Sequence, residues 1–132
     1  MGPIEIGKHC KVSYMIDAGC VYVQWFDLPP SDVFRKGCNT ALEMMQVNKS
    51  SKVLVDNSKA KLFSVADQHW LNEDWLPRAE KVGYKYSATV LGDTDAFVKY
   101  AAHGIANKRH QSNFVSQFFK TVEEAKLWLK NL

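Results

Sequence analysis

Several features that would assign a protein class are missing from this 132-residue sequence. It has no apolar run of the ~18 residues that a bilayer-spanning helix needs, and the N-terminal stretch MGPIEIGKHC lacks the apolar core and cleavage pattern of a signal peptide. Cysteine is scarce, since only Cys10, Cys20 and Cys38 occur and none forms a CxxC pair. We therefore expect a cytoplasmic protein with free thiols and no integral membrane segment. Cys10 and Cys20 are placed where they could face each other across a hairpin.

Signals for common chemistries are also missing. The net charge of +3 is small, and acidic residues are interspersed with the basic ones. We therefore expect no nucleic-acid partner. Lys108-Arg109-His110 is interpreted as a solvated loop, because three bases neutralise little phosphate. Gly92-Asp93-Thr94-Asp95 lacks the GxGxxG and GxxxxGK[ST] patterns of phosphate loops. The four histidines are scattered, so we expect no metal site and no cofactor.

Hydrophobic periodicity predicts one α/β domain over residues 1–132, with the order β-β-α-β-α-β-α-β-α. A hairpin at the N-terminus is followed by parallel βα units, which gives a mixed sheet. The predicted strands are Cys10–Asp17, Cys20–Phe26, Val53–Val55, Tyr84–Leu91 and Phe114–Phe119. The N-terminal residues before the hairpin are interpreted as a frayed or tag-derived start.

Four helices are predicted between and after these strands. The first runs from Ser31, its predicted N-cap, to about Asn48. The second begins at Ser64, has Asp67 where a capping-box acid would stand, and ends before Gly83 with a kink or restart at Pro77. The third begins at Asp93 or Thr94, and the last begins at Thr121 with Glu124 completing a capping box.

Lys52–Arg78 is the segment around which the rest is organised. Asp56-Asn57-Ser58 ends the short strand with side chains that bond their own backbone, and ligands of open α/β sheets bind beyond the carboxyl ends of strands. We therefore expect a binding crevice between this strand end and the second helix. Its candidate residues are Asp56, Ser58, Ser64, Asp67, His69, Trp70 and Glu73.

The order of elements also carries short sequence matches to a known family. The matching stretches are Trp25 in the hairpin, Val55-Asp56 at the strand end, Ser64 with Asp67-Gln68-His69-Trp70, the run Asp74–Ala79, and Glu123-Glu124-Ala125 with Trp128-Leu129. Together they resemble the small bacterial proteins labelled STAS/SEC14 domain-containing or SpoIIAA-like. The resemblance covers nearly the whole chain.

The resemblance implies a non-catalytic regulatory module that binds a protein partner or a small ligand. In the wider STAS family, some members are switched by phosphorylation of a serine in a D-S-S-G-type turn at the start of the second helix. The equivalent stretch here is Phe63-Ser64-Val65-Ala66, which lacks the paired serines and the glycine. Ser64 is the candidate for phosphorylation, and its role as a helix N-cap is the favoured interpretation.

Two other functions stay open at this point. A SEC14-like carrier of a lipid or small apolar ligand would need an enclosed apolar cavity. A small enzyme would need Asp56, His69 and Glu73 to converge in one cleft. A homodimer is also expected as a possibility, either through the hairpin edge or through Trp70 as an interface anchor.

Overall fold

The sheet holds every strand of the part of the chain that the structure describes. The computed structural model describes residues 2–60, 64–91 and 114–132. The sheet has six strands in the spatial order β1-β2-β3-β4-β5-β6. They are β1 (Ile4–Ile6), β2 (Cys10–Met15), β3 (Cys20–Asp27), β4 (Lys52–Ala60), β5 (Tyr86–Val90) and β6 (Val115–Phe119). The first two pairings are antiparallel and the other three are parallel, which confirms the predicted mixed sheet.

The N-terminal hairpin is present, but it does not form the edge of the sheet. β1 pairs with β2, so the prediction of a frayed start was wrong. Three residues are too few for a periodic signal. Cys10 is paired with Trp25 and Cys20 with Met15, and the two cysteines are buried in different core clusters. They therefore do not face each other.

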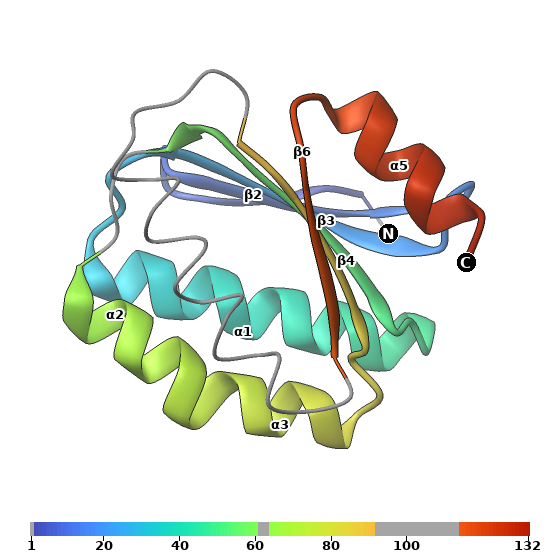
Figure 1. Ribbon diagram of the computed structural model, residues 1–132. Helices are drawn as coiled ribbons and strands as arrows, with labels where there is room; N and C mark the ends of the chain where they lie inside the picture. Colours follow the sequence, from blue (N-terminus) through green and yellow to red (C-terminus); the bar gives the residue numbers. More distant parts are fainter. Residues whose placement is uncertain (1, 61–63, 92–113) are drawn as a thin grey trace.

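Helices cover both faces of the sheet (Figure 1). α1 (Ser31–Asn48) lies beside a second helical segment made of α2 (Val65–Trp70), a π-helical turn η1 (Leu71–Trp75) and α3 (Leu76–Lys81). α5 (Val122–Lys130) lies on the opposite face. Strand side chains alternate between two clusters: Val21, Val23 and Val53 belong to the first with α1, whereas Cys20, Leu54 and Ala88 belong to the second with α5.

The first helix has the predicted bounds and a different cap. The N-cap of α1 is Pro30, whose side chain cannot bond the helix, and Ser31 is already helical. The hydroxyl of Ser31 instead donates to Asp67 Oδ2 at 3.0 Å. The prediction that Ser31 caps α1 was therefore wrong, because its hydroxyl bonds the neighbouring helix rather than its own.

The second helical segment begins and ends as predicted. Ser64 accepts the backbone N–H of Asp67 at 3.1 Å, and Gly83 follows the C-cap with φ +105°, a conformation suited to glycine. The predicted kink takes the form of the π-helical turn immediately before α3, which has Pro77 in its first turn. A wider turn absorbs the missing proline N–H without breaking the helix.

The remaining predictions divide into tested and untested ones. Thr121 caps α5 as predicted, accepting the N–H of Glu124 at 3.2 Å. The third predicted helix, the Gly92–Asp95 turn and the Lys108–His110 loop lie outside the described residues. Within the described ranges, no helix combines the length and apolarity needed to cross a membrane.

Candidate functional site

The strand that was expected to end at Val55 continues through the polar residues after it. β4 runs to Ala60, with Asp56 beside Gln24 and Lys59 beside Phe26. One residue of β3 therefore lies opposite two of β4, which is a β-bulge at Asn57-Ser58. The predicted turn is a bulge because β3 continues beside this stretch and pairs again with Lys59 and Ala60, whereas the pairing with β5 ends at Asp56.

Asp56 lies at the α5 side of the sheet and is occupied by local bonds. Its Oδ1 accepts the backbone N–H of Ser58 at 2.9 Å and the Ser58 hydroxyl at 2.6 Å. The Tyr22 hydroxyl bonds the same carboxylate, and burial, the charge of Asp56 and this bond together raise the pKa of Tyr22 to about 12. The predicted bonding of Asp56 to its own backbone is confirmed, and these bonds hold the bulge together.

The sheet separates Asp56 and Ser58 from the second helical segment. Tyr22 and Leu54, the strand neighbours of Asp56, belong to the cluster under α5, whereas Trp70, Leu71 and Trp75 belong to the cluster under α1. The predicted crevice joining Asp56 to the second helix is therefore not formed. Its error is one of strand parity, since residues 53 and 55 face α1 and residue 56 faces away.

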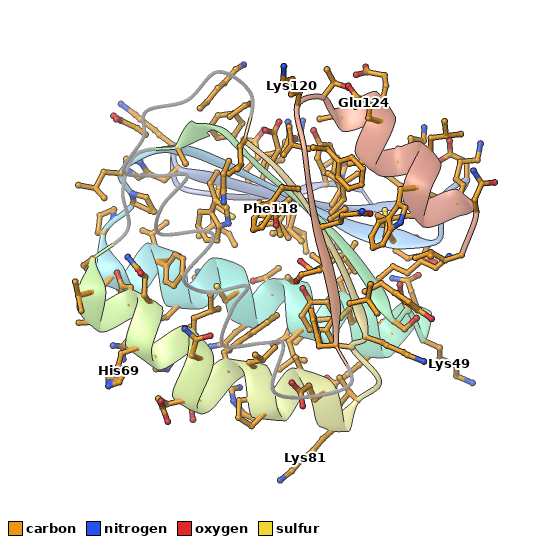
Figure 2. The ribbon with its side chains drawn as sticks, in the orientation of Figure 1. Lys49, His69, Lys81, Phe118, Lys120 and Glu124 are labelled. Carbon is orange, nitrogen blue, oxygen red and sulfur yellow. The ribbon has the colours of Figure 1, made fainter. Side chains whose placement is uncertain are left out.

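The residues of the proposed enzyme alternative do not converge. His69 and Glu73 are exposed on the outer surface of the second helical segment, and Figure 2 shows His69 pointing away from the body of the protein. Asp56 is on the other side of the sheet. This geometry gives no cleft in which Asp56, His69 and Glu73 could share a substrate.

Asp67 joins the beginnings of two helices. It is buried to 2% exposure; its Oδ2 accepts from Ser31, and its Oδ1 lies 3.8 Å from Arg35 Nε. Oδ1 has no hydrogen-bond partner among the residues that the structure describes. The sequence placed Asp67 in a capping box, and the structure shows that its carboxylate is directed to α1.

Trp70 is half-buried where these helices meet, and two arginines contact its ring. The guanidinium of Arg35 lies 5.2 Å from the ring centroid and that of Arg78 lies 5.9 Å away, distances typical of cation–π contacts. Phe34 meets the ring edge-on at 6.2 Å. Arg78 also donates to Asn39 and Asp74, both at 3.0 Å, which confirms the predicted Asp74–Arg78 pair. No sequence signal indicated Arg35.

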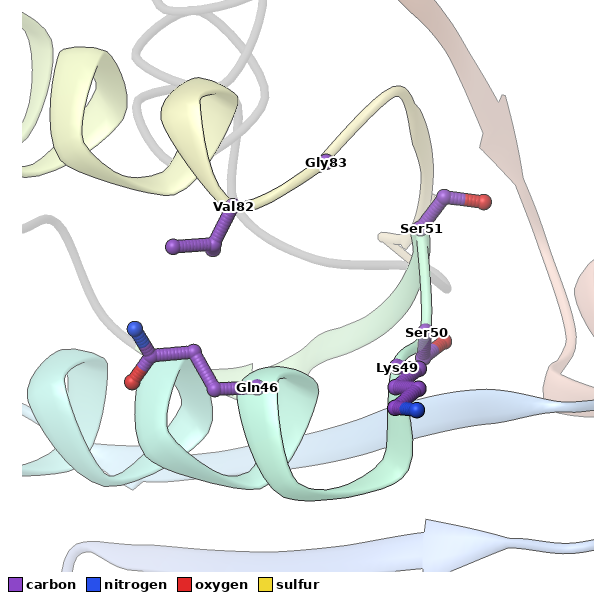
Figure 3. Close-up of a pocket in the computed structure, with 6 residues that line it drawn as sticks. All are labelled: Gln46, Lys49, Ser50, Ser51, Val82 and Gly83. Atoms are coloured by element: carbon purple, nitrogen blue, oxygen red, sulfur yellow. The ribbon is translucent and has the colours of Figure 1, made fainter.

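A groove runs between α1 and α3 from this cluster. Its main depression, of about 560 Å³, is lined by Asn39, Leu42, Glu43, Gln46, Arg78, Lys81 and Val82. A second depression of about 270 Å³ shares Gln46 and Val82 and extends to Lys49, Ser50, Ser51 and Gly83; Figure 3 shows these residues approaching it from α1 and from the end of α3. Both depressions are open to solvent and include polar or charged side chains in their linings, so neither is the enclosed apolar cavity that a lipid carrier needs.

Comparison with solved structures gives two matches over most of the chain. The first is a crystal structure of an anti-sigma factor antagonist from Mycobacterium paratuberculosis, with a TM-score of 0.57, 10% identity and 92% of each chain covered. The second is the Bacillus cell fate determinant SpoIIAA in the phosphorylated form, with a TM-score of 0.54, 12% identity, and 88% of this chain and 95% of that chain covered. The chain has the SpoIIAA-like STAS fold. At these identities the likeness concerns the fold.

No protein-family model matches the sequence, and no curated protein sequence is similar to it. The fold resemblance inferred from the sequence is confirmed by the structural matches, which cover 92% and 88% of this chain. The binding roles of Ser64, Asp67, His69, Trp70 and Glu73 stay predictions.

Proposed function

We propose that this protein is a non-catalytic regulatory module that binds a protein partner through the exposed side of its second helical segment. The observation that carries the proposal is Trp70, which is held half-buried at the surface by two arginines. Tryptophan and arginine are the residue types that contribute most to protein interfaces. The SpoIIAA-like fold supports the proposal, because one structural neighbour is an anti-sigma factor antagonist.

Exposed side chains at the start of α2 extend this surface. Val65 is 81% exposed at the first position of the helix, beside the exposed Ser64. The binding surface proposed here comprises Ser64, Val65, His69, Trp70 and Glu73. Asp56 and Ser58 are excluded from it, because they lie across the sheet.

A matched pair of surface substitutions tests the proposal. Val65→Asp puts a charge on the surface, and Leu127→Asp puts the same charge on α5, where Leu127 is 61% exposed on the opposite face. Neither residue is buried, so both variants should fold. Each variant is tagged, expressed in cells that produce the natural protein, and purified with its partners. We expect Val65→Asp to lose a co-purifying protein that Leu127→Asp retains; equal losses or equal retention would contradict the proposal.

Ser64 is also proposed as a regulatory phosphorylation site on this surface. Its side chain is exposed and stands at a helix start, where the helix dipole favours a phosphate. The buried Asp67 carboxylate three residues on opposes the added charge. Intact mass measurement of the protein from its natural cells, compared with Ser64→Ala, tests this: a species about 80 Da heavier than the unmodified chain, the mass added by one phosphoryl group, should be absent from the variant.

The structure disfavours a homodimer through the hairpin edge, because β1 pairs with the outer edge of β2 and leaves it unavailable to a second chain. Short edge strands such as β1 discourage edge-to-edge pairing. A dimer through Trp70 stays a prediction. Sedimentation of Trp70→Ala tests it, with Trp128→Ala, a half-buried tryptophan on α5, as the control: an unchanged mass in the Trp70 variant would refute it.

A further inference from the structure

We propose that the partner contributes an acidic segment, whose carboxylates bind Arg35 and Arg78 beside Trp70 and which lies along the groove between α1 and α3. This inference rests on the proposed partner-binding function. It adds the chemistry of the partner and extends the contact from α2 into the groove.

Both arginines have donor groups left over. Arg35 is 46% exposed and its Nε lies 3.8 Å from Asp67, which is too far for a hydrogen bond. Its terminal nitrogens form no hydrogen bond with the part of the chain that the structure describes. Arg78 is 43% exposed and uses one terminal nitrogen, Nη2, for both of its bonds. A guanidinium offers five N–H donors in a fork that matches a carboxylate, so each arginine can bind a further acid.

The arginines are also held in place before any partner arrives. Arg35 is fixed by Trp70 and by the charge of buried Asp67, and Arg78 is fixed by Trp70, Asn39 and Asp74. Side chains that are already ordered lose less entropy on binding. The half-buried indole between α1 and α2 adds an apolar contact for the partner.

Charge along the groove favours an acidic segment. Arg78, Lys81 and Lys49 are the basic residues that line it, and Arg35 lies at its end beside Trp70. Glu43 is the acidic residue among those that line it; Asp74 is paired with Arg78, and the buried Asp67 lies beside Arg35. Figure 2 shows Lys81 and Lys49 reaching outward at the far end of the groove. The surplus of positive charge is complementary to a segment rich in Asp or Glu.

The same charges argue for a peptide rather than a nucleic acid. Glu43 lies on the groove wall, where it would repel an uninterrupted row of phosphates. A peptide can place carboxylates near the arginines and a neutral or basic residue near Glu43. From Arg35 to Gln46, α1 rises about 16 Å, which accommodates about five residues of an extended chain.

The probe is the peptide EELEEL, titrated into isotope-labelled full-length protein at low salt. The peptide KKLKKL and a thymidine hexanucleotide are titrated in parallel. We expect EELEEL to shift the NMR signals of the Trp70 indole and of the Nε groups of Arg35 and Arg78, and KKLKKL to leave them unchanged. Arg35→Gln and Arg78→Gln should each weaken EELEEL binding about threefold, the range of a partly exposed ion pair. Lys130→Gln, which removes an exposed cation on α5, is the matched control and should leave binding unchanged.

Three results would overturn the inference: no shift at millimolar EELEEL, shifts that are equal in the Lys130 control and both arginine variants, or tighter binding of the hexanucleotide. Arg35→Gln weakens the support of buried Asp67, so thermal melting checks its fold and Arg78→Gln provides an independent test. If EELEEL fails while Val65→Asp still loses a co-purifying protein, the partner-binding function stands and its acidic chemistry is refuted. If Val65→Asp also behaves like its control, both are refuted.

Discussion

Replacing Gly37 by alanine should destabilise the protein, although alanine is the better helix former. At Gly37, α1 lies close against side chains of the hairpin. A Cβ placed there would lie 2.7 Å from Trp25 Cη2 and 2.8 Å from Cys10 Sγ. Both neighbours are buried, and the Trp25 ring is held against Phe34 at a centroid distance of 5.1 Å. Neither neighbour is the loose end of a flexible side chain.

The expected change in the free energy of unfolding is the balance of two opposed effects. Alanine gains about 1 kcal/mol over glycine inside a helix. Forcing a methyl group into a closed core costs roughly 1–3 kcal/mol. The methyl group added by Gly37→Ala would lie less than 3 Å from two rigid neighbours, so we expect a cost near the upper end of this range. We expect a net loss of about 1–2 kcal/mol in the free energy of unfolding. A domain of this size should melt roughly 3–8 °C lower.

Urea unfolding followed by tryptophan fluorescence measures the effect. Lys36→Ala, at an exposed position of the same helix, is the control and should change stability by less than about 0.5 kcal/mol. The double variant with Cys10→Ala removes one of the two clashes, so Gly37→Ala should cost less in that background. A Gly37→Ala protein as stable as the natural one, or more stable, would show that α1 moves away from the sheet at no cost and would refute the reasoning.

Three further predictions concern the core and the surface charges. Trp75→Phe should lose roughly 2–3 kcal/mol of stability by urea unfolding, because the buried indole N–H of Trp75 donates to a backbone carbonyl of α1 at 2.8 Å; a loss below about 0.5 kcal/mol would contradict it. The pKa of Asp17 is lowered by its bond to Lys126, so the pair stabilises the fold above the usual carboxyl pKa and this contribution fades as pH falls through the lowered value. NMR titration should show the Asp17 pKa rising in Lys126→Gln; an unchanged pKa would refute the pairing. Burial raises the pKa of both Cys10 and Cys20 to about 12, so neither thiol should react with iodoacetamide at pH 8 until urea unfolds the protein, and prompt labelling of the folded protein would count against this burial.

The sequence predicted most helices and strands because their signals are local. The bounds of α1 and the caps Ser64 and Thr121 follow from periodicity and capping chemistry. β1 was missed because it is three residues long and buries only Ile6. The extension of β4 was missed because Asp56-Asn57-Ser58 has the composition of a turn.

The candidate site was harder to predict because it depends on tertiary contacts. Helical spacing placed His69 and Glu73 on one exposed face, but it carries no information about the side of the sheet on which Asp56 lies. That side depends on strand parity through a bulge. Arg35 and Ser31 belong to a helix 30 or more residues before Asp67 and Trp70, and only the packing of α1 beside α2 brings them together. Such pairings leave no local pattern to read.

Site-specific photo-crosslinking tests the partner-binding surface most directly. A photoreactive amino acid is placed at position 65 in one protein and at position 127 in another, both exposed and on opposite faces of the sheet. Each protein is irradiated inside cells that produce the natural chain. The account predicts a discrete adduct with another protein from position 65, absent from position 127 and diminished when Trp70→Ala is added. Adducts of equal yield from both positions, or from position 127 alone, would contradict it.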